Sequence, residues 1–318
     1  MTTSTNRLRA RIVHPSTELE LGAFVCAIGV FDGLHEGHQF VIGKAIEQAR
    51  ELGVPALVIT FDQDPDELFL APDSQRKLLI NEDRIAFLAD SGVDMVFVIP
   101  FNLALASKNP TQFLDTVIAA HGFPRGIHIG YDFHFGHRAS GAVDDLRLWA
   151  ANRGCEIFAY KLFSNESLPV TSTRIRNALE AGDLALANRL LTRPYFLWAR
   201  VIAGRRMGKE LGFPTANLEL EERLVRPADG VYAGVVPIEG TLYRAAISVG
   251  VPATFEGASA TIEAHLLDFE GDLYAQRIRV FFLEYLREMQ AFANPEELQR
   301  VVQENIAQAR TIPLPPLP

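Results

Sequence analysis

The pattern of secondary-structure signals changes near Leu191, and this change limits what the chain can fold into more than any other feature. Before it, short apolar runs alternate with amphipathic segments, which predicts a parallel sheet with helices on both faces. After it, strand-like runs follow one another with Gly, Pro and Asp between them, which is typical of an antiparallel barrel or sandwich. The sequence therefore predicts an α/β doubly wound domain at 1–188, a mostly antiparallel β domain at 189–312 and an extended proline-rich tail at 313–318.

The expected strands and helices can be placed from periodicity and from the residues that start and stop helices. Strands are expected at 23–31, 54–61, 93–101, 126–130 and 155–160, and then at 195–204, 230–240, 241–250, 260–269 and 276–286. Helices are expected at 37–53, 81–92, 109–122, 142–154, from about 172, and at 294–310. Asn81, Asn109 and Asn294 are the expected N-caps.

Composition narrows the class of protein. The chain has 318 residues, 48% of them hydrophobic, and a net charge of -9, which argues against broad binding of nucleic acid or anionic membranes. Cys26 and Cys155 sit in apolar surroundings and are expected to be buried thiols, because their number and spacing build no disulfide framework and no zinc motif. Neither a signal peptide nor a transmembrane run is recognisable, so we expect a cytoplasmic protein; a homo-oligomer remains open.

The segment GVFDGLHEGH, at 29–38, lies where the first buried strand turns into a helix. Gly29 and Gly33 allow the backbone to approach a ligand closely, and the helix from Glu36 points its free N–H groups at the loop. His35 and His38 can donate to phosphate oxygens as charge builds during nucleotidyl transfer. The alternatives are a capped helix with surface histidines, or a zinc site for which spacing supplies no third ligand.

Two further segments lie at the carboxyl ends of expected strands. In VTSTRIR, Ser172 and Thr173 can cap a helix and bind phosphate, and Arg176 can make a forked contact, although this is also a routine capping pattern. In the loop after 126–130, aromatic residues alternate with Asp132 and His134. Such a loop can cover a flat heteroaromatic ring, or it can simply be anchored by its phenylalanines.

The second domain carries a glycine-punctuated basic loop followed by PTAN. The loop is not a Walker A motif, because it is one residue short and no Ser or Thr follows Lys209. Thr215 and Asn217 offer two neutral oxygens on one side of an extended segment, which suits Mg²⁺ bound to nucleotide phosphates. Glu263 alternates with apolar neighbours on a later strand and can act as a general base, although a lone strand Glu is more often solvated.

Taken together, these segments resemble the bacterial bifunctional riboflavin kinase/FAD synthetase family. The likeness covers about Phe24 to Arg310 and rests on GVFDGLHEGHQ, GYDFHFG, TSTRIR, LGFPTANL, DGVYAG, SVG…TF and IEAHLLDF, in that order. The resemblance implies a nucleotidylyltransferase (Rossmann-like) domain that joins FMN to AMP, and a six-stranded riboflavin kinase barrel with a C-terminal helix that phosphorylates riboflavin with ATP. Riboflavin, FMN, FAD and ATP would be its partners, with Mg²⁺ accompanying ATP.

The resemblance also implies a role for each matching residue. Glu263, His35 and His38 would be catalytic, and Thr215 and Asn217 would hold the metal. Asp132 and Phe133 would contact the flavin. The nucleotide would be bound by Gly29, Phe31, Asp32, Gly33, Ser172, Thr173, Arg176, Gly208, Gly212 and Pro214.

Three departures from the family pattern keep other readings open. Asp62-Gln63-Asp64-Pro65 stands where the family has an acid and Pro-His-Pro, and a carboxylate there would repel polyphosphate unless metal or distance intervenes. His134 stands where arginine is common, and Pro252-Ala253 replaces the usual Asn or Arg followed by Pro. The alternatives are a riboflavin kinase without the second activity, an enzyme acting on a flavin analogue, and a non-catalytic flavin- or nucleotide-binding regulator.

Overall fold

The computed structural model describes residues 9–14, 21–69, 76–161, 163–165, 168–203, 212–220, 223–250 and 261–317. The chain divides into two compact units, Met1–Ser172 and Thr173–Pro318, and each is considered by itself. The domain boundary after residue 188 stays a prediction, since compactness and function need not divide a chain at the same residue.

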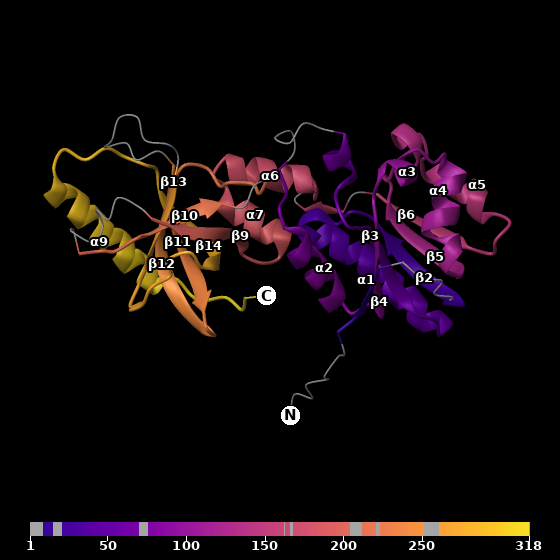
Figure 1. The fold of residues 1–318 in the computed structure, drawn as a ribbon, viewed down its shortest axis with the longest axis horizontal. Helices are drawn as coiled ribbons and strands as arrows, with labels where there is room; N and C mark the ends of the chain where they lie inside the picture. Colours follow the sequence, from indigo (N-terminus) through magenta and orange to yellow (C-terminus); the bar gives the residue numbers. More distant parts are fainter. Residues whose placement is uncertain are drawn as a thin grey trace, which may run out of the picture. The chain divides into compact units, whose positions relative to one another are not determined.

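The first unit is built on a parallel six-stranded sheet with the order β1-β4-β3-β2-β5-β6 (Figure 1). Its strands are β1 (Arg11–Val13), β2 (Ala23–Ile28), β3 (Ala56–Phe61), β4 (Met95–Ile99), β5 (Phe123–Gly130) and β6 (Glu156–Tyr160). The chain runs outward from β2 to β3 and β4, and then returns to place β5 on the other side of β2. Such a reversal opens a crevice at the carboxyl ends of the two strands, where ligands of these folds bind.

Helices cover both faces of this sheet, as the alternation predicted. They are α1 (Glu36–Leu52), α2 (Asn81–Asp90), α3 (Leu103–Ala106), α4 (Pro110–Val117) and α5 (Val143–Ala150), with short 3-10 helices η1 (Asp32–Leu34), η2 (Pro65–Leu68), η3 (Ala119–His121) and η4 (His137–Ala139). Along β2 the side chains alternate: Phe24 and Cys26 join the core under α4 and α5, whereas Val25 and Ala27 join the core under α1 and α2. A minor hairpin, β7 (Ser164–Asn165) and β8 (Leu168–Pro169), precedes Ser172.

The helix starts were predicted correctly in part. Asn109 caps α4 by accepting from Gln112 N–H, with Pro110 in the first turn, and Asn294 caps the last helix. The prediction that Asn81 is an N-cap is wrong, because Ile80 holds that place and Asn81 is the first helical residue. The Asn81 side chain bonds elsewhere, donating to the carbonyl of Asp62 at 2.7 Å.

The two cysteines differ in burial. Cys26 is fully buried on β2, and burial raises the pKa of its thiol well above the usual value. Cys155 is only partly buried, because it stands just before β6 at the edge of the sheet. The expectation of a buried thiol is therefore confirmed for Cys26 and wrong for Cys155.

The second unit contains a closed antiparallel barrel with the order β10-β13-β12-β11-β14-β9, which confirms the predicted six-stranded barrel (Figure 1). Its strands are β9 (Tyr195–Ile202), β10 (Ala216–Leu220), β11 (Gly230–Ile238), β12 (Thr241–Gly250), β13 (Thr261–Leu266) and β14 (Arg277–Arg287). Large side chains, among them Tyr195, Tyr232, Phe281 and Phe282, are fully buried in this unit. A closed sheet leaves no strand edge open to other chains.

In the described part of the second unit, the barrel is accompanied by the helices α6 (Ser172–Glu180), α7 (Leu184–Leu191) and α9 (Pro295–Thr311). Asn188 of α7 donates to the carbonyl of Phe282 at 3.0 Å and accepts from Tyr195 N–H at 2.7 Å, which ties this helix to β14 and β9. The last helix packs through Ala309 against Ala233 of β11.

A buried histidine in the first unit makes folding stability depend on pH. The neutral ring of His128 meets Gln48 Oε1 through Nε2 at 2.9 Å and Tyr160 Oη through Nδ1 at 2.9 Å. Desolvation lowers the pKa of His128 to about 4. The unfolded chain takes up this proton below about pH 6.5, so the stability that the neutral ring contributes is complete above that pH and is lost as pH falls toward 4.

We therefore expect His128 to lower the free energy of unfolding of the wild type by about 2 kcal/mol between pH 7 and pH 4, after allowance for partial screening. This loss should be absent in His128→Gln, because glutamine does not titrate. Urea unfolding at the two pH values measures it, with exposed His14→Gln as the matched control. An unchanged pH slope in the His128 variant would show that another group carries the effect.

Candidate functional site

The loop between β2 and α1 has an unusual backbone. Phe31, Gly33 and Leu34 have φ values of 60°, 81° and 40°, in the left-handed region that costs a non-glycine residue about 1–3 kcal/mol. Gly33 adopts this conformation without a steric penalty. A side chain at Gly29 would meet the Phe31 ring at 3.2 Å, so the small residue also lets the ring lie against the strand end.

Hydrogen bonds from distant parts of the chain hold this loop in place. The buried carboxylate of Asp32 accepts from Leu78 N–H at 3.1 Å and from Leu79 N–H at 3.3 Å. The carbonyl of Asp32 accepts from the hydroxyl of Ser172 at 2.8 Å, across 140 residues of sequence. Two predicted site segments are thereby joined, whereas Thr173 and Arg176 follow on α6 within the second unit.

The two histidines of the loop form a stacked pair at the start of α1. Their ring centroids are 3.6 Å apart with planes 18° from parallel. His35 is the N-cap of α1, and its Nδ1 accepts from His38 N–H at 3.3 Å. A neutral ring that accepts through Nδ1 carries its proton on Nε2, which makes Nε2–H of His35 a donor.

His38 is held in its neutral form. Burial lowers the pKa of His38 well below the usual value, and the neighbouring His35 lowers it further. Its Nδ1 is buried and has no hydrogen-bond partner among the residues that the structure describes. A buried polar atom without a partner is costly, which makes this position a candidate for a ligand contact.

The loop after β5 lies at the carboxyl end of the strand beside β2. Asp132 is exposed, and its carbonyl lies 2.8 Å from Nδ1 of His134. Phe133 is partly buried, with its ring centroid 5.5 Å from that of buried Phe135. Phe135 therefore anchors the loop, while Asp132 remains accessible at the predicted crevice.

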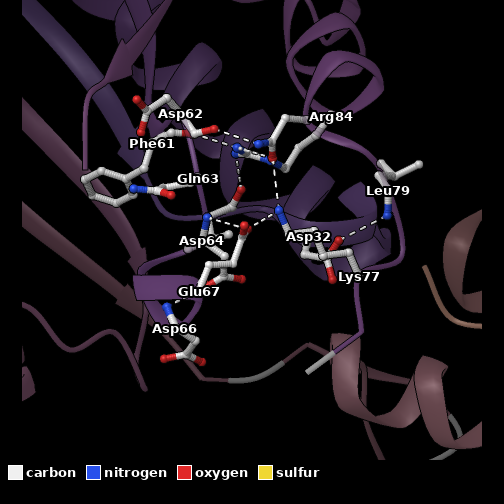
Figure 2. Close-up of polar contacts among 12 residues, drawn as sticks. Asp32, Phe61, Asp62, Gln63, Asp64, Asp66, Glu67, Lys77, Leu79 and Arg84 are labelled. Atoms are coloured by element: carbon white, nitrogen blue, oxygen red, sulfur yellow. Dashed lines mark hydrogen bonds and ion pairs between the residues drawn. The ribbon is translucent and has the colours of Figure 1, made fainter. Parts of the chain in front are cut away.

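The Asp62-Gln63-Asp64 turn after β3 is organised by its own side chains (Figure 2). Asp62 accepts from Phe101 N–H at 2.8 Å, and Gln63 donates to the carbonyl of the same residue. Asp64 caps η2 by accepting from Asp66 N–H at 3.0 Å. The carboxylates of Asp62 and Asp64, the two acids in the segment that differs from the family pattern, thus both accept hydrogen bonds from backbone N–H groups.

The barrel site brings three predicted residues together. The hydroxyl of Thr215 donates to Glu263 Oε2 at 3.2 Å across 48 residues of sequence. Asn217 on β10 lies directly opposite Glu263 on β13, which places both side chains on one face of the sheet. The preceding residue, Pro214, accepts at its carbonyl from Nδ1 of His265 at 2.8 Å.

Some predicted residues fall outside the described part of the chain, and some neighbours of the site were not predicted. Gly208, Pro252 and Ala253 lie outside the described residues, whereas Gly212 has a φ of 90°. Ser248 on β12 lies opposite Glu263 and extends its polar row, a pairing that no local sequence signal reveals.

Arg84 is a second residue that the sequence reasoning missed. It is buried on α2, and a signal was present, because Arg84 stands four residues from both Ile80 and Leu88 on the apolar stripe of its helix.

Within the described residues, no cluster of three or more His, Cys, Asp or Glu side chains could hold a metal ion. The zinc alternative for the histidine pair therefore gains no third ligand there. The same residues include no helix long and apolar enough to cross a membrane.

Comparison with known proteins agrees with the geometry of both units. Residues 18–174 match the family described as FAD synthetase, and residues 191–313 match the family described as riboflavin kinase. A protein of Pseudomonas fluorescens named bifunctional riboflavin kinase/FMN adenylyltransferase is 39% identical over 292 residues, covering 92% of this chain and 93% of the relative. A protein of Bacillus subtilis with the same name is 33% identical, covering 94% and 96%.

A solved structure, described as a macrolide-efflux protein from Streptococcus pneumoniae, is also similar. It has a TM-score of 0.83 and 30% sequence identity, and the match covers 95% of this chain and 99% of that one.

Proposed function

Because the chain belongs to the family of bifunctional riboflavin kinase/FMN adenylyltransferases, we propose that it makes FMN from riboflavin and ATP, and then FAD from FMN and a second ATP. The observation that carries the proposal is that both family matches fall on one chain, one on each kind of sheet. No specific observation favours the kinase-only, flavin-analogue or non-catalytic alternatives.

The kinase step is assigned to the barrel. The terminal ribityl hydroxyl of riboflavin attacks the γ-phosphorus of ATP, the bond to the β–γ bridging oxygen breaks, and ADP leaves. The carboxylate of Glu263 accepts the hydroxyl proton. Thr215 donates to Glu263 and thereby holds the carboxylate in place.

The adenylyl step is assigned to the loop between β2 and α1. A phosphate oxygen of FMN attacks the α-phosphorus of ATP, the bond to the α–β bridging oxygen breaks, and pyrophosphate leaves. His35 and His38 donate to the phosphate oxygens on which charge develops, without forming a covalent bond. The N-terminus of α1 and the residues Gly29, Phe31, Asp32 and Gly33 cradle the phosphates. From the family pattern, we assign Thr173 and Arg176 to the nucleotide, and Asp132 and Phe133 to the flavin.

The barrel residues fit a magnesium ion. The hydroxyl of Thr215 and the amide oxygen of Asn217 are hard, neutral ligands, and they lie beside the carboxylate of Glu263. Bound Mg²⁺ would neutralise charge on the transferred phosphoryl group. Thr215 and Asn217 would hold it, with Gly212 and Pro214 against the nucleotide.

Product analysis tests the proposal. Purified protein is incubated with riboflavin, ATP and MgCl₂, and the flavins are separated by chromatography; in a second arm, FMN replaces riboflavin. We expect FMN and then FAD in the first arm and FAD in the second, with neither product in excess EDTA. Formation of FMN without FAD would show that the protein is a riboflavin kinase only. Turnover of a flavin analogue but not of riboflavin or FMN would show that the natural substrate is a different flavin. Binding without turnover would make it a regulator.

A further inference from the structure

A buried arginine bonds the backbone where the loop that carries the histidine pair begins. Arg84 of α2 is 2% exposed, and its guanidinium donates four hydrogen bonds (Figure 2). Nη1 donates to the carbonyl of Val30 at 2.7 Å and to Thr60 Oγ1 at 2.6 Å. Nη2 donates to the carbonyl of Phe61 at 2.6 Å and to Asn81 Oδ1 at 3.3 Å.

These bonds join the ends of two neighbouring strands to one helix. Val30 follows β2, whereas Thr60 and Phe61 are the last residues of β3. The hydroxyl of Thr60 also donates to the carbonyl of Val30 at 3.3 Å, so that the guanidinium and the hydroxyl hold one oxygen from two sides. The carboxyl edge of the sheet is thereby locked at the residue where the loop begins.

The next residue along the chain explains why this lock matters. Phe31 takes a left-handed conformation, and the chain then passes through Gly33 and Leu34, both with positive φ, before His35 caps α1. Strained backbone of this kind persists only where its surroundings over-determine it. Leu78 and Ser172 bond Asp32, and the side chain of Gln39 donates to the carbonyl of Leu34. Arg84 holds the residue just before this strained stretch.

The charge of Arg84 is compensated at longer range. All four of its acceptors are uncharged groups, while the carboxylates of Asp32, Asp62, Asp64 and Glu67 attract the guanidinium. Two of these acids belong to the Asp62-Gln63-Asp64 turn that departs from the family pattern. The buried positive charge of Arg84 therefore offsets part of the negative potential that these two carboxylates would exert on a bound polyphosphate.

We propose that Arg84 is a positioning residue for adenylyl transfer, which fixes the carbonyl of Val30 and through it the loop that presents His35 and His38. The proposal rests on the proposed function of the first unit. A planar fork can bond the ends of two strands at once, whereas the single ammonium of a lysine can reach only part of this set.

The test compares Arg84→Met and Arg84→Lys with the wild-type full chain. The kcat and KM of adenylyl transfer from ATP to FMN are measured well below the melting temperature of each variant. The kcat is expressed per folded molecule, with the folded fraction taken from near-UV circular dichroism. Misplacing reacting groups by about 1 Å costs on the order of 10²-fold in rate, and we expect a loss of about that size in kcat for Arg84→Met. Arg84→Lys should recover part of it, and riboflavin phosphorylation should be unchanged in both variants.

Arg9→Met is the matched control. Arg9 is exposed, and its Nε lies 3.0 Å from Oδ1 of Asp90, the last residue of α2, the helix that carries Arg84. Its substitution should therefore leave both activities unchanged. A merely structural role for Arg84 predicts a lower melting temperature with an unaltered kcat per folded molecule, and that result would overturn the inference. Wild-type protein that makes no FAD from FMN would instead overturn the proposed function on which the inference rests.

Discussion

Replacement of Glu263 by glutamine is expected to slow riboflavin phosphorylation by about 10²–10⁴-fold, the range that a positioned general base contributes. The amide has nearly the shape of the carboxylate, and its oxygen can still accept the hydroxyl of Thr215, so the site keeps its structure. An amide does not accept a proton at neutral pH, so the attacking hydroxyl remains a poor nucleophile. The initial rate of FMN formation at saturating ATP measures the effect.

Two controls accompany this variant. Glu284→Gln makes the same chemical change at an exposed position of β14 and should leave FMN formation unaltered. ATP binding by the Glu263 variant, measured by titration calorimetry, should remain close to that of the wild type. A phosphorylation rate within a few-fold of the wild type would remove Glu263 from the role of base.

Replacement of His38 by alanine is expected to slow FAD formation from FMN by about 10²–10³-fold, the usual cost of losing one donor to a developing charge. The stacked partner His35 keeps its capping role through the backbone N–H of residue 38, which the substitution retains. The loss should appear in kcat more than in KM, since this donor acts where charge develops. Stopped assays that separate FMN from FAD measure both constants.

The kinase activity of the same preparation provides an internal control for the His38 variant, and His14→Ala tests the loss of an exposed histidine. FMN formation should be unchanged in both variants. Equal loss of FAD and FMN formation would mean that the two activities are coupled, and an unchanged rate of FAD formation would place the donor elsewhere.

Local sequence predicted the class of each unit, whereas the closure of the second sheet into a six-stranded barrel was expected only from the family resemblance. Buried strands are continuous apolar runs, and helices carry their caps and breakers within a few residues, so Asn109-Pro110 and Asn294-Pro295 were recognisable without a structure. The short edge strand β1 was missed because three residues carry too little periodicity to be distinguished from a loop. The barrel strand β10 and the helix α7 were not predicted from periodicity either. Asn81 was misjudged as a cap because its side chain is used by partners far away in sequence.

The same division holds for the candidate sites. Sequence by itself determined which residues can bind phosphate or a metal ion, because the chemical properties of glycines, histidines and a Thr-x-Asn pair at a strand end do not depend on the rest of the fold. Only the tertiary structure decided which of them meet: Ser172 with Asp32, Thr215 with Glu263, and Arg84 with the ends of β2 and β3. These contacts join residues between 23 and 140 positions apart, and no local propensity specifies such pairs, since they follow from strand order and from the side on which each helix packs.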